Sequence, residues 1–374
     1  MSQLSEIIRN EVSRHGVLPF ARFMELALYC PKHGYYETKK DNPGRRGDFY
    51  TSVGVGELFG QLLAFQFAEW MEDQVHSPQS TVQIVEAGAH NGRLAKDILA
   101  CLQLNRPELF DQLEYWIIEP SAVRQEWQRE TLREFVPRVR WFAGFQSLFE
   151  DRSCHPPPAT RHPPVRGVIF SNELLDAMPV QRFGWDAAQR AWFEWGVAVE
   201  GDRFAWAKIP HSALPIPHSD FPSSPELLAV LPDGYTIETC SAAENWWREA
   251  AGVLAGGKLM TIDYGLTAGE LFSPARSRGT LRAYHRHRAG DDLLADVGEQ
   301  DLTAHVNFST LQSAGEAAGL KTESLQTQSQ FLVQILAKAG LSLGEWTSAR
   351  ARQLQTLTHP EHLGRAFRVL VQSK

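Results

Sequence analysis

Cysteine is scarce in this chain of 374 residues, which has only Cys30, Cys101, Cys154 and Cys240. They are widely spaced, and none belongs to a CxxC pair, so a disulfide framework is not expected. We expect reduced thiols, most of them small core residues.

Long apolar runs and targeting signals are also missing. No apolar run reaches the roughly 20 residues that a membrane-spanning helix needs. The first residues, MSQLSEIIRNEV, lack the basic and apolar regions of a signal peptide and the Arg- and Ser-rich, acid-poor composition of a transit peptide. These absences predict a cytoplasmic protein without membrane insertion.

Blocks of like charge and a phosphate-binding GxxxxGK[ST] loop are absent as well. The net charge of −7 disfavours a protein that coats nucleic acid. Without the loop, phosphate-loop chemistry is not supported. What is present is an ordinary globular composition, 43% hydrophobic and 22% charged, in a chain whose length predicts about two domains.

The most informative stretch is VQIVEAGAHNGRLAKDIL at residues 82–99. Its short apolar beginning is typical of a strand buried on both faces. Glu86 ends that strand, glycines follow at 88 and 92, and apolar residues then recur at helical spacing from Arg93. This order predicts a nucleotide-type cofactor pocket at the carboxyl edge of an open α/β sheet.

Strands and helices alternate from residue 82 onward, which predicts crossover connections and a mostly parallel sheet of seven strands. The expected strands are 82–86, 115–119, 139–143, 167–171, 257–263, 320–327 and 365–372. The expected helices between them are 93–104, 122–134, 241–255 and 308–318.

Four segments are expected along the chain. Residues 1–80 predict a helical cap on the main sheet with a cofactor-covering loop, and residues 81–179 predict the first part of the α/β domain. Residues 180–240 alternate like antiparallel strands and predict an inserted β-rich subdomain. Residues 241–374 complete the α/β domain, with a polar lid loop at 266–306.

Two smaller features belong to this organisation. The stretch 151–166 is rich in proline and predicts a surface loop. The tryptophans of the β insertion form either a partner surface or, as aromatic alternation usually does, an inward-facing core. These tryptophans are Trp185, Trp192, Trp195 and Trp206. The oligomeric state is not predicted.

The glycine turn, Gly88-Ala89-His90-Asn91-Gly92-Arg93, departs from the GxGxxG fingerprint of dinucleotide sites. In that fingerprint the middle glycine lets the backbone approach a pyrophosphate. His90 occupies that place here, and Arg93 occupies the third. S-adenosylmethionine has no phosphate and does not need this approach, so the turn favours it over a dinucleotide.

Acids at two successive strand ends, Glu86 and Glu119, agree with that cofactor. Glu86 would favour the positive sulfonium and ammonium groups through water or the turn amides. Glu119 can accept hydrogen bonds from both ribose hydroxyls. Each acid alone fits an ordinary surface position, but the pair favours a cofactor site.

The fourth strand end reads Asn172-Glu173-Leu174-Leu175-Asp176. Methyl transfer depends on positioning and electrostatics, and a guanidinium acceptor needs carboxylates to orient it. Glu173 and Asp176, three apart at an expected helix start, would share one face. The alternative is a helix N-terminus with acidic capping residues and no catalytic role.

The fifth strand end and the lid hold further candidates. Asp263 fits a turn residue, and Tyr264 fits a wall of an acceptor pocket. The cluster at 285–287, His-Arg-His, lies in an expected loop without the fixed ligand spacing that a metal needs, so no metal is expected. Asp301 and His305, four apart, are candidates for an Asp–His contact.

Together these stretches resemble the MidA-like methyltransferase family, which includes mitochondrial complex I assembly methyltransferases and bacterial relatives. The resemblance runs to about residue 372, with dissimilar loops at 151–166 and 209–235. The matching pieces are GYY at 34–36, GDFYTS at 47–52, LFG at 58–60, the glycine turn, SNELLDAMPV at 171–180, DYG at 263–265, and GTLRAYHRHR through DLTAHVNF at 279–308.

The resemblance implies a seven-stranded Rossmann-like methyltransferase that uses S-adenosylmethionine. Its implied acceptor is an accessible arginine of a protein, by resemblance a respiratory complex I subunit. The cofactor candidates are Thr51, Ser52, Glu86, Gly88, Gly92 and Glu119. The catalytic candidates around the acceptor are Asn172, Glu173, Asp176, Asp301 and His305.

Three motifs depart from the family pattern: GPGxG is GAHNG, TSPE is TSVG, and FGE is FGQ. Two alternatives stay open. One is a methyltransferase with another nitrogen or a small-molecule acceptor, and the other is a non-catalytic assembly or binding protein. A nucleic-acid amine methylase is disfavoured because its Asn-Pro-Pro-aromatic motif is absent from the fourth strand end.

Overall fold

The computed structural model describes residues 2–38, 51–72, 81–149, 165–209, 224–285, 288–290 and 292–374. The chain divides into two compact units. Unit 1 comprises Met1–Lys39, Asp176–Asn245 and Gly265–Leu311, and unit 2 comprises Lys40–Leu175, Trp246–Tyr264 and Gln312–Lys374. Cys154, most of the proline-rich loop, the first residues of GDFYTS, and Arg286 with His287 lie outside the described residues.

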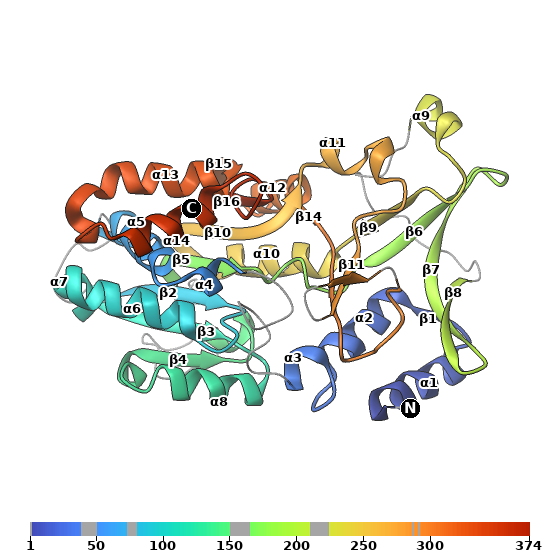
Figure 1. The fold of residues 1–374 in the computed structure, drawn as a ribbon, viewed down its shortest axis with the longest axis horizontal. Coiled ribbons are helices and arrows are strands. Elements are labelled where there is room, and N and C mark those ends of the chain that lie inside the picture. The colour runs from blue at the N-terminus through green and yellow to red at the C-terminus, as the bar shows by residue number, and fades with distance from the viewer. Residues whose placement is uncertain are drawn as a thin grey trace. The chain divides into compact units, whose positions relative to one another are not determined.

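Unit 2 contains the main sheet, shown in Figure 1. Its strands are β2 (Val82–Ala87), β3 (Leu113–Ile118), β4 (Val139–Phe142), β5 (Val165–Asn172), β10 (Leu254–Leu266), β15 (Lys321–Thr327) and β16 (Phe367–Ser373). They lie in the order β15-β16-β10-β5-β2-β3-β4. Those from β10 to β4 are parallel, and β16 is antiparallel to both neighbours.

All seven expected strands are present, and the α/β class with a mostly parallel sheet is confirmed. The described part of the sheet has one strand more than expected, because β14 (Val306–Asn307) pairs with the last two residues of β10. A strand of two residues is too short to show a period in the sequence.

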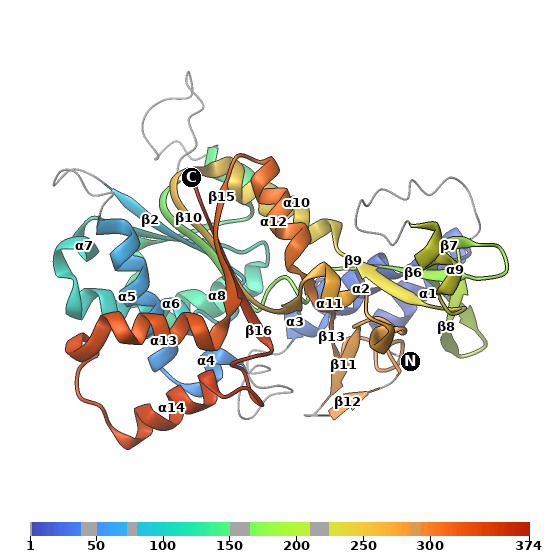
Figure 2. The same cartoon turned by 90° about the horizontal axis from the view of Figure 1, so that it is seen from above.

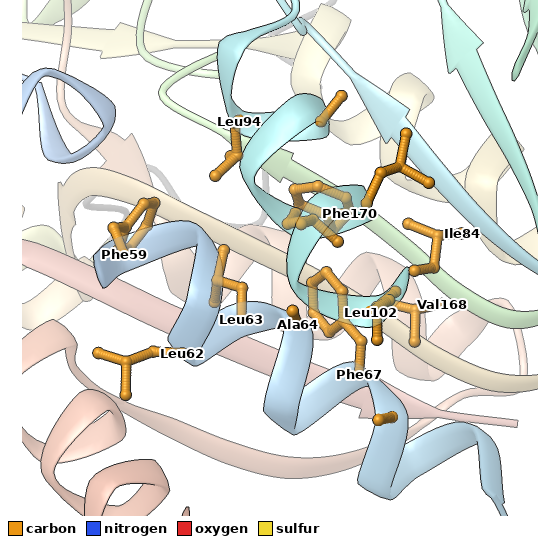
Figure 3. Close-up of a cluster of buried hydrophobic side chains, with 14 of the residues drawn as sticks. Phe59, Leu62, Leu63, Ala64, Phe67, Ile84, Leu94, Leu102, Val168 and Phe170 are labelled. Atoms are coloured by element: carbon orange, nitrogen blue, oxygen red, sulfur yellow. The ribbon is translucent and has the colours of Figure 1, made fainter. Parts of the chain in front are cut away.

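One face of the main sheet is covered by α5 (Leu58–Glu72), α6 (Arg93–Asn105) and α13 (Gln328–Ala339), whose apolar side chains form the main core with the strands. Figure 3 shows Phe67 of α5 beside Phe170 of β5, with ring centroids 5.0 Å apart. Buried aromatic pairs at this distance stabilise a core beyond the area they bury.

The opposite face carries α10 (Ser241–Val253) and α12 (Phe308–Ala317), as Figure 2 shows. Trp247 Nε1 donates a hydrogen bond to Gln372 Oε1 at 2.7 Å, and Gln372 Nε2 donates to Gln312 O at 3.0 Å. Gln372 follows Val371 of the main core, and neighbouring strand residues face opposite sides. The sheet is therefore buried on both faces, as its apolar strands predict.

The other helices of unit 2 are α4 (Ser52–Val55), α7 (Pro107–Asp111), α8 (Ala122–Thr131) and α14 (Ser348–Thr358). Neither α13 nor α14 is among the expected helices. The start of α13 carries a sequence signal, a capping box between Thr327 and Gln330. In α14 only Leu357 is buried, so its sequence has no strong apolar stripe.

Unit 1 contains α1 (Gln3–His15), α2 (Phe20–Tyr29), α3 (Tyr35–Thr38) and an antiparallel sheet. The strands of that sheet are β1 (Leu18–Pro19), β6 (Gln181–Asp186), β7 (Ala191–Glu200), β8 (Arg203–Lys208) and β9 (Thr236–Thr239). β6, β7 and β8 pair antiparallel, as their alternation predicts. Trp185 and Trp192 are buried together in this unit, with ring centroids 5.3 Å apart.

Residues 2–38 pack with this β insertion. β1 pairs with β7, and buried side chains of α1 and α2 share a core with Val180 and Val197. The structure thus separates them from α5, which packs on the main sheet, although residues 1–80 were expected to form one cap. An amphipathic stripe shows that a helix face is buried, but it does not identify the partner.

The described residues of the segment 266–306 form more regular secondary structure than the expected loop. The segment contains the helix α11 (Ala268–Leu271) and the strands β11 (Arg282–His285), β12 (Arg288–Gly290) and β13 (Asp301–Thr303). These three strands form a small antiparallel sheet. The helix α9 (Pro225–Val230) also belongs to unit 1 and precedes this segment. Strands this short are fixed by pairing and leave little pattern in the sequence. No helix in the described ranges is long and apolar enough to cross a membrane.

Candidate active site

Four strands of unit 2 end in one row at the carboxyl edge of the main sheet. Gly88 follows β2, Glu119 follows β3, Glu173 follows β5, and Asp263 lies near the end of β10. Ligands of open α/β sheets bind outside these strand ends. The row is therefore the candidate active site of unit 2.

The glycine turn keeps left-handed backbone at three alternate positions. Gly88 has a φ of 76°, His90 of 45° and Gly92 of 81°. A Cβ on Gly88 would lie 2.9 Å from Leu174 Cδ1, so the turn packs directly on the fourth strand end. His90 takes the conformation that a glycine would take freely, at a cost of roughly 1–2 kcal/mol.

Glu86 is buried inside β2, where Tyr115 Oη of β3 donates a hydrogen bond to Glu86 Oε2 at 2.6 Å. The carboxyl group is thus held by the neighbouring strand, not by the turn amides through which it was expected to act. Burial raises the pKa of Glu86 to about 7, although the hydrogen bond from Tyr115 opposes this shift.

We predict that Glu86→Gln removes a pH dependence of stability. Between pH 4.5 and about 7 the folded protein keeps a proton on Glu86 that the unfolded chain has released. The free energy of unfolding of the wild type therefore falls as pH rises through this window, with a contribution of roughly 3 kcal/mol from this group. Urea unfolding at pH 5 and pH 8 measures the difference.

The matched control for this experiment is Glu114→Gln, on β3 and paired with Arg140. It should retain the pH dependence of the wild type. If Glu86→Gln and the wild type lose stability in parallel between the two pH values, the raised pKa of Glu86 is wrong.

Glu119 is buried at the end of β3 and is bonded on both carboxylate oxygens. Oε1 accepts hydrogen bonds from Ser121 N and Arg124 Nε, both at 2.9 Å. Oε2 accepts one from Gln128 Nε2 at 3.2 Å. A carboxylate oxygen accepts two hydrogen bonds, so Oε2 has capacity for a hydroxyl beside Gln128.

Glu173 does not start a helix, contrary to the expectation for the fourth strand end. Residues 173–178 form bends and a turn, and Glu173 has a φ of 53°. Its Oε1 accepts hydrogen bonds from Ser52 N at 2.9 Å and Asn172 Nδ2 at 3.1 Å. Glu173 and Asp176 therefore share no helix face, and they belong to different units.

Burial raises the pKa of Glu173 to about 8, the nearby Asp263 carboxylate adds to the shift, and the two hydrogen bonds oppose it. A non-glycine residue with left-handed backbone and a strongly shifted pKa is typical of a functional position. Its left-handed backbone and raised pKa therefore distinguish Glu173 from ordinary acids at strand ends.

Asp263 fixes the backbone of the fourth strand end. Its Oδ2 accepts hydrogen bonds from Leu174 N at 3.2 Å and Leu175 N at 2.8 Å, and its Oδ1 accepts one from Tyr264 N at 2.8 Å. The side chain is completely buried. The sequence predicted that Asp263 is itself a turn residue. In the structure Asp263 lies in β10 and instead holds the turn that follows β5.

Thr51 and Ser52 begin α4. Thr51 caps this short helix by accepting a hydrogen bond from Gly54 N at 2.9 Å. Ser52 Oγ donates to Gln328 Oε1 at 3.0 Å, while Ser52 N donates to Glu173. The TSVG segment is thus bonded to the fourth strand end, although the two are far apart in sequence.

The remaining three catalytic candidates lie in unit 1. Asp301 is completely buried and accepts a hydrogen bond from Tyr36 Oη at 2.8 Å. His305 N donates to Thr280 Oγ1 at 3.1 Å, and burial together with nearby arginines lowers the pKa of the His305 imidazole to about 4. Asp176 contributes its carbonyl to Ala304 N at 2.9 Å.

The structure brings seven predicted residues to one sheet edge of unit 2: Thr51, Ser52, Gly88, Gly92, Glu119, Asn172 and Glu173. Sequence reasoning did not assign Asp263 or Gln128 to the site. The position of Asp263 at a strand end was a signal for the first. Gln128 lies within a polar helix and has no such signal.

The chain matches a family model over residues 62–326, and that family is described as "Putative S-adenosyl-L-methionine-dependent methyltransferase". A crystal structure of a Burkholderia thailandensis protein bound to S-adenosyl-homocysteine is 32% identical, covers 99% of this chain and 92% of its own, and has a TM-score of 0.78. The human protein arginine methyltransferase NDUFAF7, mitochondrial, is 28% identical over 96% of this chain and 80% of its own. Its Drosophila melanogaster homolog is 26% identical over 98% and 84%.

The chain therefore belongs to this family of S-adenosylmethionine-dependent methyltransferases, the MidA-like family that the sequence resembles. Its cofactor is S-adenosylmethionine, and the site fits it: the turn lacks the pyrophosphate glycine, and Glu119 can accept a further hydroxyl. The cytoplasmic location expected from the missing targeting signals is contradicted, because the curated relatives are named mitochondrial.

Proposed function

We propose that this methyltransferase methylates an arginine side chain of a protein. The observation that carries the proposal is Glu173, a carboxyl group in strained backbone at the fourth strand end, held by Ser52 N and Asn172 Nδ2. The relatives named protein arginine methyltransferases support the same acceptor.

Glu173 is suited to a cationic acceptor. With a pKa of about 8 it holds its proton at neutral pH, and an arriving guanidinium favours the ionised carboxylate. The carboxylate then accepts hydrogen bonds from the guanidinium and orients one nitrogen for in-line attack. The cofactor supplies the electrophilic methyl group, and Asn172 fixes the orientation of Glu173.

The other candidates are assigned roles in the same proposal. Glu119 holds the ribose, Gly88 and Gly92 shape the turn beside the cofactor, and Thr51 with Ser52 closes this side of the site. Glu86 acts on the positively charged cofactor from inside β2, through the electrostatic field of its buried carboxyl group. Asp176, Asp301 and His305 belong to unit 1, and their role toward the acceptor stays a prediction from the resemblance. A respiratory complex I subunit is the proposed substrate.

Methyl-labelled S-adenosylmethionine tests the proposal. The protein is incubated with it and with cell extract or purified complex I, and the labelled protein is hydrolysed to amino acids. The label is expected in methylated arginine. Label in another amino acid or in a small molecule would establish the alternative acceptor class, and label in arginine of other proteins alone would exclude complex I.

A further inference from the structure

Gln128 joins three parts of unit 2 with one side chain. It lies on α8 and is completely buried. Its Nε2 donates to His90 O at 3.0 Å and to Glu119 Oε2 at 3.2 Å, and its Oε1 accepts from Trp141 Nε1 at 3.0 Å. The amide orientation is determined by these partners, because the indole can only donate and the two oxygens can only accept.

The hydrogen bond to His90 O restrains a strained turn. His90 has left-handed backbone where glycine is usual, and such a conformation persists only where its surroundings hold it. The backbone of α8 also packs on the turn, since a Cβ on Gly92 would lie 3.3 Å from Gln128 Cα. Gln128 thus supports the turn by its side chain and by its main chain.

The hydrogen bond to Glu119 fixes the other half of the site. Ser121 N and Arg124 hold Oε1 from the start of α8, and Gln128 holds Oε2 from the next turn. Oε2 is the oxygen with capacity for a further donor. Gln128 therefore determines the direction in which that oxygen is presented.

We propose that Gln128 is a positioning residue for the cofactor: its carboxamide holds the glycine turn and the ribose-binding carboxylate in one fixed geometry. It acts through His90 and Glu119, and Trp141 prevents its amide from rotating. The inference rests on the proposed ribose role of Glu119.

The test compares binding of S-adenosylhomocysteine with binding of its 2′-deoxy analogue by calorimetry. The ratio of the two affinities is measured on the same folded protein, so a partly unfolded variant does not distort it. Wild type is expected to prefer the ribose form by about 10- to 100-fold, as for a hydrogen bond to a charged group. Gln128→Met should reduce this preference to about threefold or less.

Gln125→Met is the matched control. Gln125 lies one turn away on α8 and donates to the main-chain oxygen of Glu119 at 2.8 Å, not to its carboxylate. It should keep the wild-type preference. If Gln128→Met keeps it too, the inference is wrong. If wild type itself shows no preference, the ribose role of Glu119 is wrong instead.

A single variant at Trp141 covers a failure of Gln128→Met to fold, and a double variant tests the role at the turn. Trp141→Phe keeps an aromatic ring but removes the donor to Gln128 Oε1 and should reduce the preference about threefold; an unchanged preference overturns the inference. His90→Gly relieves the strained turn. The double variant with His90→Gly and Gln128→Met should therefore bind S-adenosylhomocysteine several-fold more tightly than Gln128→Met alone. No gain in that double variant would overturn the role at the turn.

Discussion

Glu173→Gln is expected to lower the rate of methyl transfer by about 10²- to 10³-fold, the usual effect of removing one preorganised electrostatic contact, while S-adenosylhomocysteine still binds. The amide keeps the size of the side chain and an oxygen that can accept from Ser52 N and Asn172 Nδ2. It cannot become the negative charge that orients a guanidinium. The loss should therefore appear in kcat more than in cofactor affinity.

The pH profile gives a second readout of the same group. Burial raises the pKa of Glu173 to about 8, so the ionised form increases as pH rises toward 8. For wild type, kcat/KM should rise about tenfold per pH unit below 8 and level off above it. The profile of kcat should level off at a lower pH, because the bound guanidinium favours the carboxylate.

The control for this variant is Glu323→Gln on β15, whose carboxylate pairs with Lys258 at 2.5 Å. It should leave both rate and profile unchanged. A Glu173→Gln enzyme that retains more than about half of the wild-type rate, or that keeps the acid limb near pH 8, would remove Glu173 from the catalytic assignment; contacts of this kind contribute far more than twofold.

Asp263→Asn is expected to lower the free energy of unfolding by roughly 3 kcal/mol, because buried backbone donors lose a charged acceptor and one of them meets an amide donor. Asp263 accepts from three main-chain N–H groups and is completely buried. Equilibrium unfolding in urea measures the change. Activity should fall as well, since the same contacts hold the fourth strand end.

Asp97→Asn on α6 is the matched control for stability. Burial raises the pKa of Asp97 to about 6, because it disfavours the charged form of the carboxyl group. The neutral amide of asparagine does not carry this cost. At neutral pH this variant should therefore leave the protein at least as stable as the wild type, because the amide has no charge for burial to disfavour. A loss below about 1 kcal/mol for Asp263→Asn would mean that the chain finds other acceptors for these amides.

Much of the framework could be predicted because it depends on local patterns. The apolar runs that become β2, β3 and β5 are buried on both faces, so their sequences show it directly. The position of Glu119 follows from the end of its strand. The fourth strand end was selected for its carboxylates, which stays a prediction, and the helix expected there does not form.

Other features depend on contacts between distant segments. The sequence gives no indication that Asp263 bonds the amides of Leu174 and Leu175, or that Ser52 N bonds Glu173. Gln128 is one of several polar residues on α8, and only its burial distinguishes it. The first helices were expected on the main sheet, but they pack in unit 1. An apolar stripe shows that one face of a helix is buried and does not identify the surface it packs against.

By itself the sequence determined the class of sheet, the order of its strands along the chain and the acids at their carboxyl ends, because each depends on residues close in sequence. The tertiary structure decided the hydrogen-bond partners and the pKa of each carboxyl group. Glu86 accepts from Tyr115, Asp263 accepts from the turn after β5, and burial raises the pKa of Glu173. Hydrogen bonds and burial set these properties. Both come from segments far apart in the chain, which only folding brings together.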